Sequence, residues 1–152
     1  MTTTETRLHS YEVRDPAQLI AEISDQAPLV MGSAHLALVR DVSSEQRILR
    51  VDRLRVPAEI VDYQEGQAEL RRVADAWSLP YAAGPPRYTP VLVVVRPGLC
   101  VTGPNEGMWF VAGRYANLGG TLWSVREVLV TEHGWLDITT NEAGHTPRAS
   151  SP

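Results

Sequence analysis

The sequence contains a single cysteine, Cys100. One cysteine excludes an internal disulfide bond and any zinc cluster built from cysteines, and it agrees with a reducing compartment. The chain also lacks an apolar run of the roughly 20 residues that a membrane-spanning helix requires. Its opening residues, MTTTETRLHS, lack the apolar core of a signal peptide. We therefore expect a cytoplasmic protein that does not enter a membrane.

Basic residues are fewer than acidic ones. The chain has 14 Lys and Arg residues against 18 Asp and Glu residues, which gives a formal net charge of -4. Nucleic-acid-binding proteins usually carry a basic excess, so this balance argues mildly against general binding to DNA or RNA. The histidines show no spacing typical of a metal site; they are His9, His35, His133 and His145. The sequence therefore predicts neither a metal nor another cofactor.

The overall composition is that of an ordinary folded domain. Of the 152 residues, 43% are hydrophobic and 21% are charged, as in globular proteins. A chain of this length forms one core and buries roughly 70% of the surface that its unfolded state exposes. There is no internal repeat and no sign of a second domain. We expect residues 1–140 to form the domain and residues 141–152 to be a flexible polar tail.

The first part of the chain predicts a helix and a hairpin. Asp15 suits a helix cap and Pro16 suits the first helical position. Two runs rich in β-forming residues, 36–39 and 48–56, lie on either side of a polar connection and predict a hairpin. The apolar alternation of the second run changes phase near Asp52-Arg53, which predicts a bulge there.

The middle and the end of the chain predict two more helices, a buried strand and a closing hairpin. Pro57 opens a helix that continues to about Ser78, and Gly66 on its apolar stripe either weakens the helix or lets its backbone approach the sheet. Residues 91–95 are all apolar, which is typical of a strand covered on both faces. A helix follows over residues 104–118 and ends at Gly119-Gly120. Residues 126–131 and 135–138 form the last hairpin, with a turn at residues 132–134.

The predicted fold class is therefore α/β (α+β), one three-layer domain with a mixed sheet in the order α-β-β-α-β-α-β-β. This order, the stretch LVVVRPGLCVTGPNEG and the stretch VREVLVTEHGWLDI resemble the RadC-like branch of the JAB/MPN metalloprotein family over about residues 33–138. In that family a hydrophobic strand runs into a His-x-His-Pro-Ser-Gly loop and a helix that carries an Asp ligand. Pro97 and Glu106 coincide with the pattern. The resemblance implies a JAB/MPN, cytidine-deaminase-like architecture.

The resemblance also implies where zinc ligands would lie, and this sequence departs from the family there. Laid on this chain, the two His positions become Val94 and Arg96, and the Asp position becomes Gly107. The upstream Glu that would take a proton from zinc-bound water falls near residues 33–35, where there is no acid. Zinc needs nitrogen, sulfur or carboxylate ligands. The resemblance therefore implies a metal-free member that does not hydrolyse by this mechanism.

Other residues could still support catalysis. Cys100 precedes the predicted third helix, and a thiol near a helix N-terminus has a lowered pKa, so a cysteine-dependent enzyme with His133 or His35 as base is an alternative. A half-buried, inert cysteine is the simpler interpretation. Glu132, His133 and Asp137 resemble a triad in sequence, but hairpin turns collect such residues in any case.

Arginines are concentrated in the predicted first hairpin. Arg50, Arg53 and Arg55, in the segment 47–55, could bind phosphate groups, so a nucleic-acid-associated protein is a second alternative. The same residues could instead be a solvated strand face with acidic neighbours.

Exposed aromatic side chains carry the leading hypothesis. Phe110 lies on the outward side of its predicted helix beside Arg114, and Tyr81, Tyr88 and Trp123 lie in connectors. Aromatic residues and arginine are enriched where proteins bind one another. We therefore expect a non-catalytic, metal-free JAB/MPN-like module that binds a protein partner or forms a homo-oligomer, with Phe110 and Arg114 at the contact.

Overall fold

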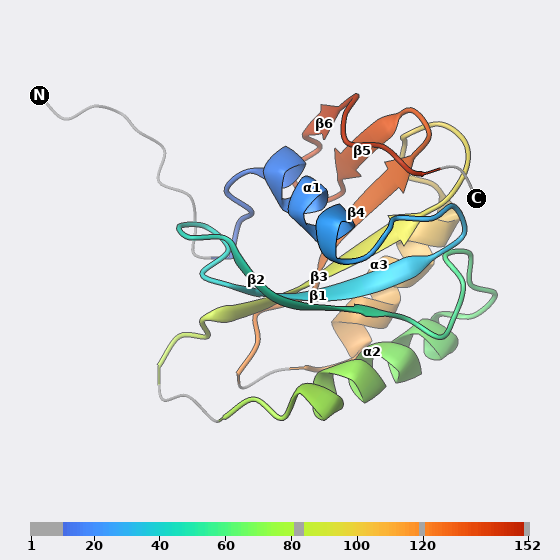
Figure 1. Cartoon of the computed structure of the whole chain (residues 1–152). Helices are drawn as coiled ribbons and strands as arrows, with labels where there is room; N and C mark the ends of the chain where they lie inside the picture. Colours follow the sequence, from blue (N-terminus) through green and yellow to red (C-terminus); the bar gives the residue numbers. More distant parts are fainter. Residues whose placement is uncertain (1–10, 81–83, 119–120, 151–152) are drawn as a thin grey trace, which may run out of the picture.

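A computed structural model describes residues 11–80, 84–118 and 121–150 of the chain. Within these residues a six-stranded sheet has the order β2-β1-β3-β4-β5-β6. Helix α1 covers one face of the sheet, and helices α2 and α3 cover the other (Figure 1). The predicted α/β class and mixed sheet are confirmed. The elements are α1 Pro16–Gln26, β1 Ala34–Arg40, β2 Arg47–Arg53, α2 Tyr63–Trp77, β3 Tyr88–Val95, α3 Pro104–Tyr115, β4 Arg126–Thr131, β5 Gly134–Asp137 and β6 Ala143–Gly144.

The centre of the sheet is the all-apolar strand β3. It pairs antiparallel with β1 and parallel with β4, and α3 makes the crossover between β3 and β4. Residues 91–95 have no exposed surface because both faces of the strand are covered. Val91, Val93 and Val95 pack on the α1 side, whereas Leu92 and Val94 pack on the side of α2 and α3. The corner where β3 leads into α3 therefore follows a run of strand that is covered on both faces.

Local signals explain several boundaries. The Asp15 side chain accepts a hydrogen bond from the Gln18 amide at 3.2 Å, and Pro16 opens α1, as predicted. Helix α2 begins at Tyr63 and not at Pro57, because Asp62 is its cap and accepts from the Gln64 amide at 2.9 Å. Helix α3 ends at Tyr115 and not at Gly119-Gly120, because Asn117 already takes a left-handed conformation with a φ of 52°. Residues 119–120 themselves lie outside the described residues, as do His9 and Tyr81.

Two details of the sheet differ from the predictions. The bulge of the β1–β2 hairpin lies at Leu49, because Leu38 pairs with Arg50 while Val39 pairs with Ile48; the prediction of a bulge near Asp52-Arg53 is wrong. The described part of the segment predicted as a tail is bonded to the core. Its residues 143–144 form β6 on the edge of β5, and the Ala149 amide donates to the Thr131 carbonyl at 2.9 Å.

Gly66 allows a close approach of α2 to α3. A Cβ atom at this position would lie 2.9 Å from the ring of Trp109, so the close approach expected from the sequence exists, but it is made to α3 and not to the sheet. We predict that Gly66→Ala lowers the free energy of unfolding by about 1 to 3 kcal/mol, since the buried indole must move. Gly107→Ala in α3 is the control, because a Cβ atom there meets nothing within 4 Å. Urea denaturation of both variants tests this, and equal stabilities would contradict it.

None of the helices in the described part of the chain is both long and apolar enough to cross a membrane.

Candidate functional site

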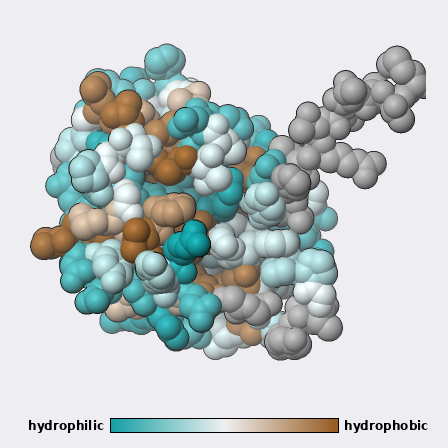
Figure 2. Space-filling model, turned by 180° about the vertical axis from the view of Figure 1, so that it is seen from behind, coloured by the Kyte–Doolittle hydropathy of each residue, from teal (hydrophilic) through white to brown (hydrophobic). Residues whose placement is uncertain are grey.

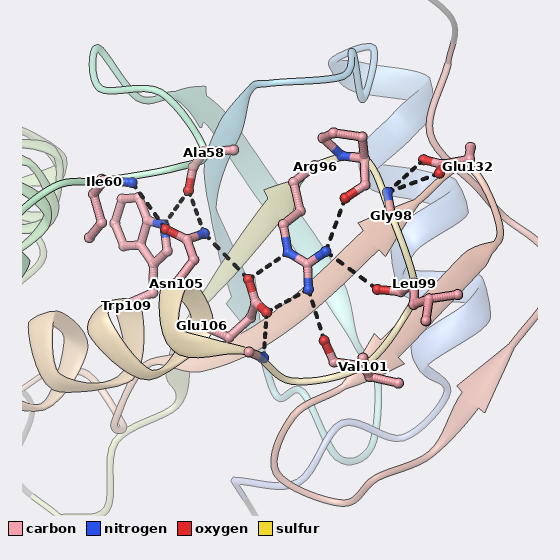
Figure 3. A network of polar contacts seen from close by, with 12 residues as sticks. Ala58, Ile60, Arg96, Gly98, Leu99, Val101, Asn105, Glu106, Trp109 and Glu132 are labelled. Carbon is pink, nitrogen blue, oxygen red and sulfur yellow. Dashed lines mark hydrogen bonds and ion pairs between the residues drawn. The ribbon is translucent and has the colours of Figure 1, made fainter.

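The corner between β3 and α3 is filled by the side chain of Arg96. Its guanidinium donates to the two carboxylate oxygens of Glu106 at 2.8 and 2.7 Å (Figure 3). It also donates to three carbonyl oxygens of its own loop, those of Pro97 at 3.0 Å, Leu99 at 3.3 Å and Val101 at 2.8 Å. A guanidinium has five N–H donors, so these bonds use them all. The loop of residues 96–103 is therefore folded around one guanidinium group, all of whose donors are used.

Glu106 is saturated in the same way. Its carboxylate accepts from Arg96, from the Gly103 amide at 2.8 Å and from the Asn105 side-chain amide at 3.3 Å. Burial works to raise the pKa of Glu106, but the bonds from Arg96 and Gly103 outweigh it and hold that pKa below its ordinary value. The partnership likewise raises the pKa of Arg96. Both side chains are therefore ionised at neutral pH. Neither has an unused hydrogen-bond donor or acceptor to offer a ligand.

Two side chains of α3 join this network to the loop that precedes α2. The Asn105 side chain donates to the Ala58 carbonyl at 2.9 Å and accepts from the Ile60 amide at 3.0 Å. The indole of Trp109 donates to the same Ala58 carbonyl at 2.7 Å (Figure 3). On the far side, the Gly98 amide donates to Glu132 at 2.9 Å. The corner is thus tied to two other segments of the fold, residues 58–60 and the turn at Glu132.

The residues at this corner do not fit zinc. Val94 is fully buried in the core, and the Arg96 guanidinium is a cation that donates hydrogen bonds and has no lone pair to offer. His35 does not substitute for the missing ligands, because it stands opposite Val93 on the α1 side of the sheet. Its ring nitrogen lies 2.9 Å from the Ser33 hydroxyl, and burial, followed by the charge of Arg53, lowers its pKa to about 4. Over the described ranges no cluster of three His, Cys, Asp or Glu side chains could hold a metal ion.

Cys100 and His133 do line one shallow hollow, together with Glu132 and His145. Burial raises the pKa of the Cys100 thiol, against the opposite effects of Thr131 and Arg96, so the direction expected from a helix N-terminus is wrong. The triad-like sequence does not assemble either. The Asp137 carboxylate accepts from the Thr139 amide at 3.0 Å, while His133 pairs with Glu132 at 3.3 Å on the surface.

The state of this thiol can be measured by alkylation. We predict that iodoacetamide reacts with Cys100 near neutral pH about tenfold more slowly than with free cysteine, because only the thiolate attacks and burial disfavours it. Mass spectrometry of the time course gives the rate. A rate equal to or above that of free cysteine would support the cysteine-dependent alternative.

The hairpin arginines do not share one face. Arg50 is exposed and forms a bidentate pair with Asp52 at 2.8 Å, on the side where Asp52 also accepts from the Trp77 indole. Arg53 stands opposite His35, whose side faces α1. The Arg55 amide donates to Glu69. Arg50 and Arg53 therefore lie on opposite faces of the sheet and do not form one basic surface together.

A pocket of about 250 Å³ lies beside α3, and both residues of the predicted contact line it. Phe110 is 55% exposed, which confirms its outward position, and Arg114 is one helical turn further along. Trp123 lines the pocket from the segment that leads into β4. Figure 2 views the molecule from behind, and on this face hydrophobic groups form separate brown spots among hydrophilic ones.

The same pocket contains a residue that the sequence did not single out. Glu127, on β4, lines it and is only 4% exposed. Burial, and to a lesser degree the charge of Glu106, raise its pKa to about 9. The available signal was its place in a predicted strand of the sheet: every residue of β4 is buried, so an acid there is directed toward one of the two cores.

Comparison with known proteins found no match, neither among protein families, nor among curated proteins, nor among solved structures.

Proposed function

We propose that this chain is a non-catalytic, metal-free JAB/MPN-like module of the cytoplasm, and that it acts by binding a protein partner or a second copy of itself. The observation that carries the proposal is the saturated Arg96–Glu106 pair at the corner between β3 and α3. In a hydrolase of the JAB/MPN type this corner needs open coordination positions and a water molecule. Here a guanidinium takes that space, and its hydrogen bonds fix the loop.

The outward face of α3 supports recognition as the remaining role. Phe110 is 55% exposed and lies next to the pocket, with Arg114 beside it. Leu99 and Val101, in the loop around Arg96, are also exposed, at 69% and 57%. Because the loop is held by the ion pair, these apolar side chains are presented by a rigid backbone. Rigid presentation lowers the entropy lost on association.

Replacing Phe110 tests the proposal. We expect Phe110→Asp to weaken association at least about tenfold, whether the partner is another protein or a second copy, because a central aromatic anchor contributes much of the affinity. Val61→Asp is the matched control, since Val61 is 90% exposed but precedes α2. Sedimentation velocity measures self-association, and affinity capture with quantitative mass spectrometry measures partners. A monomeric wild-type protein whose captured proteins are the same with Phe110→Asp would contradict the proposal.

A further inference from the structure

Among the residues that the structure describes, the buried carboxyl group of Glu127 has no hydrogen-bond partner. Its side chain is 4% exposed, and neither carboxyl oxygen has a hydrogen bond in the structure. A buried polar group without a hydrogen bond is costly, and a buried unpaired charge more so. Glu106 is just as buried, but its oxygens accept bonds from Arg96, Gly103 and Asn105. Unlike Glu106, Glu127 therefore keeps both carboxyl oxygens available to a group from outside the chain.

The position of Glu127 gives such a group a way in. The residue stands opposite Leu92, whose side chain belongs to the core beneath α2 and α3, so Glu127 is directed toward α3. There it lines a pocket of about 250 Å³, which is also lined by Trp123 and by Phe110, whose side chain is 55% exposed. A volume of this size accommodates one side chain or a small molecule, and not a larger ligand.

The lining of the pocket contains one acid, Glu127, and one base, Arg114, which lies exposed. The nearby charge of Glu106 is already balanced by Arg96, so Glu127 is the acid that a cationic ligand group would meet. The segment 122–125 and Thr139 line the pocket with uncharged side chains. No ion pair to Glu127 occurs among the residues that the structure places. Aromatic rings such as those of Phe110 and Trp123 attract guanidinium and ammonium groups.

We propose that this pocket binds the cationic end of an arginine or lysine side chain of a protein partner, with Glu127 as its counter-ion and Phe110 and Trp123 as its walls. This inference rests on the proposed function and names the chemistry of the partner's contact. Since burial keeps the empty carboxyl group protonated at neutral pH, entry of a cation transfers the carboxyl proton to the buffer. Binding is therefore coupled to the release of up to one proton, and net charge is balanced within the pocket.

A pair of isosteric probes tests the inference. N-acetyl-arginine methylamide carries the cation, whereas the corresponding citrulline compound has nearly the same shape and no charge. Each is titrated into the full-length protein near neutral pH, with the indole N–H resonance of Trp123 as reporter. Calorimetry in two buffers of different ionisation enthalpy measures proton release. We expect the arginine probe to bind at least about tenfold more tightly than the citrulline probe and to release protons.

Two variants make the result specific. Glu127→Gln keeps the size of the side chain and removes the acid, so it should weaken the arginine probe at least about tenfold and abolish proton release. Glu142→Gln, which removes an exposed acid that does not line the pocket, is the control and should leave binding of the arginine probe unchanged. Three results would each overturn the inference: no shift of the Trp123 resonance at about 10 mM arginine probe, equal affinity for both probes, or equal affinity of Glu127→Gln and the wild type.

The outcome is separable from that of the proposed function. If Phe110→Asp abolishes association while Glu127→Gln leaves it intact, the module binds partners but not through a cation in this pocket. If the arginine probe binds in a Glu127-dependent way while Phe110→Asp affects no association, the pocket is a cation site but the interaction surface lies elsewhere. The first result contradicts the inference alone, and the second contradicts the proposed function.

Discussion

Glu127→Gln is expected to stabilise the protein, and increasingly so as the pH rises. The folded protein holds the pKa of Glu127 at about 9, whereas the ordinary value is 4.5. Between these values the folded chain keeps a proton that the unfolded chain has released, so the wild-type protein loses stability as the pH rises. The loss approaches about 1.4 kcal/mol per pH unit within that window. Glutamine does not titrate, and its variant lacks this slope.

Urea denaturation from about pH 5 to about pH 8 measures the effect. The gap in free energy of unfolding between Glu127→Gln and the wild type should widen by at least about 2 kcal/mol over this range. Glu142→Gln, which replaces an exposed acid, is the control. Its free energy of unfolding should change with pH as that of the wild type does. A gap that does not change with pH would mean that Glu127 is ionised in the folded state and has a partner or solvent.

The second large effect is expected at the Arg96–Glu106 pair. Arg96→Met leaves Glu106, a fully buried carboxylate, without its cation, and should lower the free energy of unfolding by about 3 to 5 kcal/mol. Because the pair holds the pKa of Glu106 below its ordinary value, the stability it contributes is present at neutral pH. It is lost as the pH falls through the lowered folded value. Arg96→Met should therefore destabilise the protein at neutral pH and differ less from the wild type in acid.

A double-mutant cycle separates this from a general loss of packing. Arg96→Met combined with Glu106→Leu removes both charges, and should cost much less than the sum of the two single variants. Arg87→Met is the control, because its pair with Asp41 is 55% and 19% exposed and should matter far less. Additive effects of the two single variants would show that the bonds in the corner do not act as a unit.

Local patterns predicted most elements because each is specified by nearby residues. The β-forming residues of 126–131, the apolar run of 91–95 and the cap at Asp15 need no knowledge of the rest of the chain. Strand β3 nonetheless begins at Tyr88, ahead of the apolar run, because Tyr88 and Pro90 pair with β1. Pro90 is tolerated there because β4 begins to pair only at Val91.

The misses arise where partners distant in sequence decide the structure. Ala58 and Ile60 are apolar residues that extend the stripe of α2, yet they are held outside the helix by bonds to Asn105 and Trp109. The bulge at Leu49 depends on how β2 pairs with β1. The sequence of residues 143–150 predicts a polar tail because it has no apolar pattern. Their contacts with β5, Thr131 and Leu29 are mostly backbone hydrogen bonds, which do not depend on the side chains.

Part of the candidate site could likewise be predicted from the sequence, and part depends on the packing of distant segments. The outward position of Phe110 follows from helical periodicity, and the absence of metal ligands at Val94, Arg96 and Gly107 is legible in the sequence. The sequence does not show that Arg96 pairs with Glu106, ten residues later, or that Glu127 has no partner among the described residues. Both depend on the tertiary structure. A charged residue in a strand can be solvated, paired or orphaned, and only the packing of α3 on the sheet distinguishes these outcomes.

The zinc content of the purified wild-type protein, measured by elemental analysis before and after equilibration with zinc and gel filtration, tests most directly whether the corner between β3 and α3 is closed. We predict zinc well below one atom per chain in both samples, and the same low content in Glu106→Gln. Zinc retained at one atom per chain by the wild type and lost in Glu106→Gln would contradict the closed corner, and with it the assignment of this chain as a non-catalytic module.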